Sequence, residues 1–222
     1  MNNKTLLCGR LAFACLVIAS SESHAAITVF TSEASFLAAV SAPGVDTFAG
    51  FSTTTVTASP ITRAAGPYTY NASSATGFFG AGTLADPALS TNSDLDAITF
   101  FNVGGGASAI GGTFFGSDLE GGFVASAVVL TATDTLGAIS TQTFVATPTS
   151  FMGFVSTGSI ATLVYSTSMP GNFVFAAVDD LIIAAVPVTP IPEPENWALL
   201  LVGLAALGAC ARRRRSDSRS IA

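Results

Sequence analysis

The chain of 222 residues has few cysteine, histidine and lysine side chains, and all of them lie near its two ends. Its 3 cysteines and 1 histidine are Cys8, Cys15, Cys210 and His24. Of its 8 basic residues only Arg63 lies between residues 26 and 190, which contain no lysine. This central segment therefore cannot form a disulfide, a Cys/His zinc site, a Ser-His-Asp or Cys-His nucleophile, or a lysine Schiff base.

Acidic residues dominate the charge of the central segment. They are Glu33, Asp46, Asp86, Asp94, Asp96, Asp118, Glu120, Asp134, Asp179 and Asp180. Set against Arg63 alone, they give a net charge of about −9, compared with −6 for the whole chain. So acidic a segment is repelled by nucleic acid, and we expect no nucleic-acid partner. Carboxylate chemistry survives, because such groups can bind calcium or act in pairs.

Residues 1–25 have the pattern of a secretory signal peptide. Lys4 and Arg10 supply the charged region, residues 11–19 are apolar, and small residues lead up to Ala25. We expect signal peptidase to cut after Ala25. A retained N-terminal anchor is the alternative, and the shortness of the apolar run disfavours it.

The C-terminal part combines three elements in a fixed order. Pro192, Glu193 and Pro194 form an extended motif, because proline fixes φ and removes a backbone donor. An uncharged, apolar stretch follows, for which we expect a short transmembrane helix over about residues 196–211, although a full span takes about 20 residues. The basic cluster that ends it consists of Arg212, Arg213, Arg214 and Arg215. Basic residues hold their end of a span in the cytoplasm.

This tail has two interpretations: a permanent membrane anchor, or a temporary anchor that is cut off after export. The order of its elements resembles the PEP-CTERM sorting signal of exported proteins of Gram-negative bacteria, also labelled the ice-binding protein C-terminal domain. Trp197 and Ala198, placed after the Pro-Glu-Pro motif, are similar to the PEPxxWA variant. The resemblance covers roughly residues 190–215. It implies recognition by exosortase, a membrane transpeptidase, and an association with exopolysaccharide and biofilm, but not ice binding.

These features predict the organisation of the chain. The expected parts are a signal peptide at 1–25, a β-sandwich domain at 26–186, a linker at 187–190, a sorting domain at 191–215 and a cytoplasmic remnant at 216–222. The expected location is a precursor anchored in the inner membrane, followed by the cell surface or the extracellular matrix.

The central segment is rich in Thr, Val, Ile, Phe, Ser and Gly, which favours strands joined by tight turns. We expect an all-β fold, an antiparallel two-sheet sandwich of jelly-roll-like type. The expected strands lie at 27–31, from 46 onward, 97–103, 107–115, 123–133, 139–145, 151–155, 159–166 and 172–183, with short strands and loops over 49–94.

One helix is expected over residues 32–40, capped by Ser32, with Phe36, Leu37 and Val40 on one face. The dipeptide at 43–44, Pro-Gly, is expected to end it. The stretches around Phe36 and Asp179 resemble the β-sandwich domains of PEP-CTERM proteins, which are similar to lectin-like and carbohydrate-binding sandwiches.

Two acidic pairs are candidate calcium or ligand sites. Asp179 and Asp180 are adjacent in a strand, so one of them is expected to be buried and to need a partner, either a cation or backbone amides. Asp94 and Asp96 lie on one face of an extended segment and form either half of a calcium site or a pair of solvated loop acids. The tyrosines at 68 and 70 are either an exposed sugar platform or core residues.

The sequence therefore predicts a non-enzymatic, exported surface or matrix protein. Its expected partners are signal peptidase and exosortase for processing, the membrane through the C-terminal helix, and extracellular polysaccharide. No cofactor is expected apart from calcium. The alternatives are a carboxylate-dependent enzyme acting on glycans, such as a glycosidase, and a permanently anchored structural protein.

Overall fold

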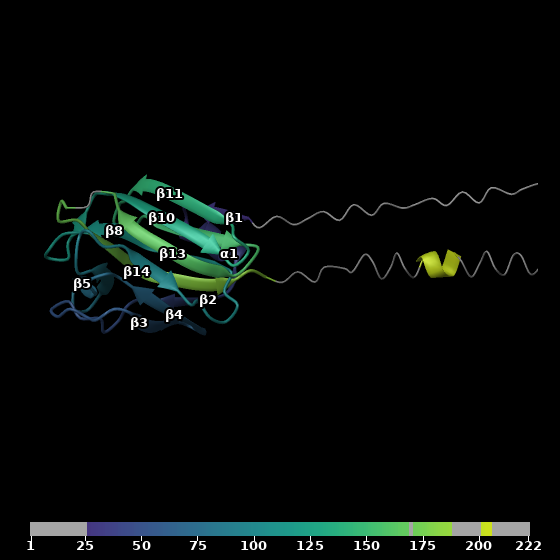
Figure 1. The fold of residues 1–222 in the computed structure, drawn as a ribbon, viewed down its shortest axis with the longest axis horizontal. Coiled ribbons are helices and arrows are strands. Elements are labelled where there is room, and N and C mark those ends of the chain that lie inside the picture. Colours follow the sequence, from purple (N-terminus) through teal and green to yellow (C-terminus); the bar gives the residue numbers. More distant parts are fainter. Residues whose placement is uncertain (1–25, 169–170, 188–200, 206–222) are drawn as a thin grey trace, which may run out of the picture. The chain divides into compact units, whose positions relative to one another are not determined.

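The structure, a computed structural model, describes residues 26–168, 171–187 and 201–205. Residues 26–187 form two antiparallel sheets, which confirms the predicted all-β, two-sheet sandwich (Figure 1). Sheet A has the order β1 (Ile27–Phe30), β12 (Phe151–Ser156), β8 (Ala109–Ser117), β14 (Phe175–Ala185), β6 (Pro87–Thr91) and β5 (Phe78–Gly82), with β2 (Ser41–Asp46) beside β14 and β9 (Phe123–Val124) beside β8. Sheet B has the order β11 (Ile139–Val145), β10 (Ala127–Asp134), β13 (Ile160–Thr167), β7 (Ile98–Phe101), β4 (Tyr68–Ser73) and β3 (Ile61–Ala65).

The core lies between the two sheets and follows from the alternation of side chains along each strand. On β10, Val128, Leu130 and Ala132 are fully buried, while the residues between them are half-buried on the outer face. Across the core, the rings of Phe114 on β8 and Tyr165 on β13 lie with centroids 5.1 Å apart. Each large side chain buried in this way contributes about 2 kcal/mol to stability.

A short helix, α1 (Glu33–Ala39), covers part of the outer face of sheet A. Phe36 is its fully buried residue and Val40 is buried just after it, as predicted, but Leu37 is 37% exposed. Ser32 occupies the N-cap position without a capping hydrogen bond from its side chain. The Phe36 ring lies on β12, where a Cβ atom at Gly153 would stand 2.4 Å from it. The helix can therefore pack this close to β12 because Gly153 has no side chain.

The prediction that Pro43 and Gly44 end the helix in a turn was wrong, because both belong to β2. Pro43 is tolerated because the register between β2 and β14 is irregular there, and proline is found at such irregular positions. Gly44 is needed because a Cβ atom at this position would lie 2.1 Å from the carbonyl oxygen of Ala65. The expected strand from residue 46 onward was also wrong, since β2 ends at Asp46.

The single strand expected over residues 123–133 is divided in two. Its first part, β9, pairs with β8 in sheet A, and its second part, β10, pairs with β11 and β13 in sheet B. The chain crosses from one sheet to the other between them, which a hydrophobic pattern along one strand cannot reveal. The strand expected at 139–145 has the predicted bounds.

The chain divides into two compact units, Met1–Val186 and Pro187–Ala222. In the second unit, the described residues 201–205 are helical and include the exposed apolar side chains of Leu201, Val202 and Leu204.

Candidate ligand-binding cleft

The central strand of sheet A is interrupted at Asp179 and Asp180. One edge of β14 pairs with β6 up to Val178 and with β2 from Leu181 onward. Its register with β8 shifts between Asp179 and Ile182, and Asp180 has a φ of 47°. Bulges of this kind re-aim side chains and are enriched next to functional sites.

The outer face of sheet A is hollowed into a cleft of about 600 Å³ at this bulge. Its floor contains a row across three paired strands: Phe151 on β12 is in register with Thr113 on β8, which is in register with Asp179 on β14. The remaining lining residues are Thr31, Ser32, Glu33, Phe115, Phe123, Pro148, Thr149 and Asp180. The volume lies within the range of about 300–1,000 Å³ typical of ligand pockets.

The cleft combines aromatic rings, hydroxyl groups and carboxylates. The rings of Phe115 and Phe123 lie 6.3 Å apart, and Phe123 is 38% exposed. Thr113 and Thr149 contribute hydroxyls and Asp179 a carboxylate. A polyol could stack on the rings and donate hydrogen bonds to the carboxylate, since O–H···O⁻ bonds are among the stronger ones in proteins.

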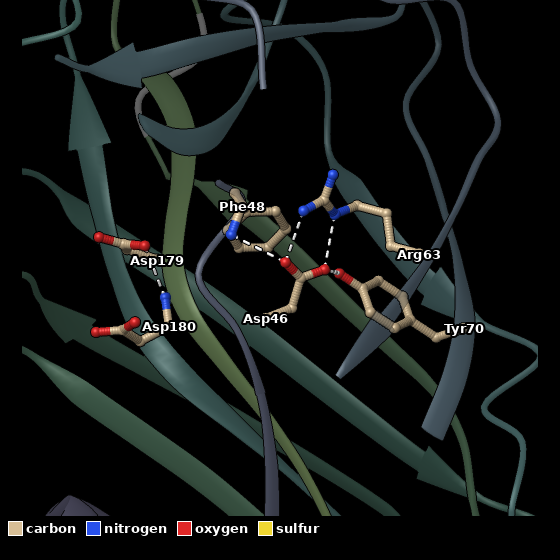
Figure 2. A network of polar contacts seen from close by, with 6 residues as sticks. All are labelled: Asp46, Phe48, Arg63, Tyr70, Asp179 and Asp180. Carbon is tan, nitrogen blue, oxygen red and sulfur yellow. Dashed lines mark hydrogen bonds and ion pairs between the residues drawn. The ribbon is translucent and has the colours of Figure 1, made fainter. Parts of the chain in front are cut away.

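Burial raises the pKa of Asp179 to about 6, and the negative charges of Asp180 and Asp86 add to the effect. A hydrogen bond of 2.8 Å, donated by the backbone N–H of Asp180 to Asp179 Oδ1, opposes the shift without cancelling it. Figure 2 shows the carboxylates of both residues pointing away from the buried polar network around Asp46. The bulge therefore places a half-buried carboxylate in the cleft without a cationic partner among the described residues.

The prediction that one member of the 179–180 pair is buried is correct only in part, because Asp179 is half-buried and Asp180 is exposed. A metal is not favoured by the geometry: within residues 26–168, 171–187 and 201–205, no group of three or more His, Cys, Asp or Glu side chains could hold a metal ion. The residues of this cleft alone do not complete a calcium site.

Asp94 and Asp96 do not act as a pair. Asp94 Oδ2 accepts a hydrogen bond of 2.8 Å from the backbone N–H of Phe173. Asp96 Oδ2 accepts from the hydroxyl of Ser74 at 3.0 Å and from the backbone and hydroxyl of Thr76 at 2.8 and 2.7 Å. Each carboxylate thus connects its loop to a different neighbouring segment by hydrogen bonds, so both acids stabilise the fold.

The polar network that the sequence did not reveal surrounds Asp46, which is 5% exposed (Figure 2). Arg63 donates two hydrogen bonds of 2.7 Å to its two oxygens, Tyr70 donates one of 2.7 Å, and the backbone N–H of Phe48 donates one of 2.9 Å. Burial would raise the Asp46 pKa, but these bonds hold it below its usual value. The network joins β2 of sheet A to β3 and β4 of sheet B. Arg63 also lies over the rings of Phe48 and Phe51, at 5.2 and 5.9 Å.

Both tyrosines singled out in the sequence are buried: Tyr68 is 4% exposed and Tyr70 is fully enclosed. They are core residues, so the interpretation as an exposed sugar platform is wrong. A smaller hollow of about 150 Å³ lies elsewhere on sheet A, and its one acid, Asp118, already accepts hydrogen bonds from the backbone of Glu120 and Gly122. The larger cleft is therefore the better candidate site.

The processing residues lie outside the described part of the chain. They are Ala25, Pro192, Glu193, Pro194, Trp197, Ala198, Arg212, Arg213, Arg214 and Arg215. Among the described residues, no helix has the length and apolar character needed to cross a membrane. Comparisons of this chain with protein-family models, with curated proteins and with solved structures find no match.

Proposed function

We propose that this protein is an exported surface or matrix protein of a Gram-negative bacterium that binds extracellular polysaccharide through the cleft on sheet A. The observation that carries the binding proposal is the pairing of Thr113 with Asp179 on neighbouring strands, which places a hydroxyl beside a carboxylate in the cleft. The rings of Phe115 and Phe123 line the same cleft. In the part of the chain that the structure describes, no basic side chain lines the cleft. Its ligand is therefore a neutral glycan, or an anionic one bridged by calcium.

Export and sorting rest on the two ends of the chain. The signal peptide ending at Ala25 and the tail containing Pro192, Glu193 and Pro194 support processing by signal peptidase and then exosortase. The short transmembrane helix at about 196–211 would hold the precursor in the inner membrane until cleavage. A jelly-roll-like arrangement of the sandwich is part of the same proposal.

Binding is tested with the full-length chain, purified in mild detergent, on an array of neutral and acidic oligosaccharides, with calcium and with a chelator. We expect a neutral glycan to be retained, and Asp179→Asn to lower its affinity about tenfold, because a hydrogen bond to a charged group contributes about 1.5–3 kcal/mol. Phe123→Ala should weaken binding as well. The matched control is Thr162→Val on β13, far from the cleft. Failure to bind any glycan under either condition removes the polysaccharide proposal.

Sorting is tested separately by intact mass and cell fractionation. A mature protein that begins at Ala26 and lacks the Arg212 to Arg215 cluster supports both cleavages. A mature protein that retains this cluster in the membrane fraction supports the permanently anchored alternative instead.

A second candidate function is an enzyme that acts on glycans through carboxylates. It is favoured by the half-buried position of Asp179 in the cleft. Burial there raises the pKa of Asp179 to about 6, which suits a group that must give up a proton near neutral pH. Release of new reducing ends from a bound polysaccharide, abolished by Asp179→Asn, would establish it. Binding without any such release supports the non-enzymatic proposal.

A further inference from the structure

The outermost strand of sheet B, β11, has one edge that no described strand covers. It pairs with β10 along its whole length, from Ile139 opposite Thr133 to Val145 opposite Ala127. In the described part of the chain no strand pairs with its other side, and it forms the outermost strand of sheet B in Figure 1.

The hydrogen-bond register shows which groups point outward. Backbone bonds from Asp134 to Ala138 (3.0 Å) and from Ala146 to Ser126 (2.9 Å) mark bonded pairs at the two ends of the β10–β11 hairpin. Bonded pairs alternate with non-bonded pairs in an antiparallel ladder. The residues of β11 whose backbone groups face away from β10 are therefore Ile139, Thr141, Thr143 and Val145.

This edge lacks the features that normally keep sheet edges apart. Charged side chains, prolines, bulges and covering loops are the usual protections. The seven residues of β11 include no charge, no proline and no glycine, and Ile139 and Val145 are 68% and 69% exposed. The edge strand β5 offers a contrast, because neighbouring loops cover it. Phe78 exchanges backbone hydrogen bonds with Thr57, and the N–H groups of Gly80 and Gly82 donate to loop carbonyls.

The residues of β11 are nearly symmetric about Gln142, with threonines on both sides and branched apolar residues at both ends. We propose that β11 pairs antiparallel with β11 of a second copy about a twofold axis at Gln142, joining two B sheets into one. In this register Thr141 faces the partner's Thr143, and Ile139 faces the partner's Val145. The outward groups then form about eight hydrogen bonds between the copies, since each bonded pair exchanges two.

The distribution of charge favours this edge over other surfaces. The two charged residues on the strands of sheet B, Arg63 and Asp134, are paired or buried on its inner side. The remaining acids lie in loops, on α1 or on sheet A. Two copies that each carry a net charge of about −9 in this segment repel least when they approach through an uncharged strand.

Sedimentation velocity of the full-length chain in mild detergent tests the proposal, which does not depend on glycan binding. We expect a dimer for the wild type and a monomer for Thr143→Pro, because the N–H that is lost points away from β10 and the chain's own ladder stays intact. Thr143→Val keeps the backbone donor and should remain dimeric. A monomeric wild type, or dimers that persist in Thr143→Pro, would overturn the proposal.

The register has its own test, which also applies if Thr143→Pro fails to fold. In a chain with Cys8, Cys15 and Cys210 replaced by alanine, Gln142→Cys should form a disulfide-linked dimer on mild oxidation, because residues on the axis face each other within disulfide reach. Thr131→Cys should not form such a dimer, because Thr131 lies on β10 and β11 separates it from the partner. Cross-linking at both positions, or at neither, overturns pairing through β11.

Discussion

At the scale of single residues, Asp46 forms the one ion pair found among the described residues. Asp46→Asn leaves the guanidinium of Arg63 without its counter-charge, and we expect it to lower the free energy of unfolding by about 3 kcal/mol. Tyr70→Phe removes one donor and should cost about 1 kcal/mol. Urea unfolding of the full-length chain measures both. Glu120→Gln, in an exposed loop, is the control and should change stability by less than about 0.5 kcal/mol.

The loss of stability caused by Asp46→Asn also depends on pH. Because the folded pKa of Asp46 is lowered, its ionised form contributes stability above the unfolded pKa of about 3.9, and this contribution disappears as pH falls through the folded value. The difference between wild type and Asp46→Asn should therefore shrink in acid. A difference that stays constant down to pH 2 contradicts the assigned role of the ion pair.

Asp179 should show the opposite dependence. Its folded pKa is raised to about 6, so the folded protein binds more protons than the unfolded chain between about pH 4 and 6, and stability falls as pH rises through this window. Asp179→Asn should remove this loss while keeping the acceptor for the N–H of Asp180. In urea unfolding from pH 4 to 7, the free energy of unfolding of the variant should rise relative to that of the wild type as pH increases, and the difference should become constant above about pH 6. If the difference in free energy of unfolding between the two proteins does not change with pH, Asp179 is not desolvated as described.

Residue patterns alone located the Asp179–Asp180 pair but not what surrounds it. The bulge directs the side chain of Asp179 toward the cleft. It forms where β6 and β2 both pair with one edge of β14, and these strands are separated by tens of residues in the chain. The ion pair of Asp46 and Arg63 was missed for the same reason. One available signal was that a lone basic residue in so acidic a segment is a strong candidate for a buried partner.

At the scale of elements, α1 depends on a glycine in the strand beneath it. Gly153→Ala would place a methyl group against the ring of Phe36, and overpacking of this kind costs about 1–3 kcal/mol. It should also weaken glycan binding, because Glu33 at the start of α1 lines the cleft. The control is the double variant: in a Phe36→Ala background the same change should cost far less. Equal costs in both backgrounds would show that the ring is not the obstacle.

Local sequence predicted the elements well where a strand stays in one sheet. The strand Ile139–Val145 was located to the residue because it consists mostly of β-branched and aromatic residues and follows the turn at 134–137. Prediction failed where tertiary contacts override local preference. Pro43 and Gly44 are typical of a turn, yet they lie in β2, where an irregular register accepts the proline and a close approach to Ala65 requires the glycine.

At the scale of the whole molecule, composition predicted the architecture: two antiparallel sheets with a core between them. The order of strands in each sheet was not predictable, because it follows from pairings between distant segments that a single sequence does not encode locally. Export and sorting remain predictions from the two ends of the chain, to be checked by mass.

The position of Arg63 has a last consequence, for proteolysis. Trypsin cuts after lysine and arginine, and Arg63 offers the one such bond between residues 26 and 187. Its side chain is held by Asp46 and lies over two phenylalanine rings in the folded state. We expect trypsin to trim the ends of the native chain and leave this domain whole, and to cut it once, after Arg63, when urea unfolds it. Mass spectrometry of the digest then reports unfolding.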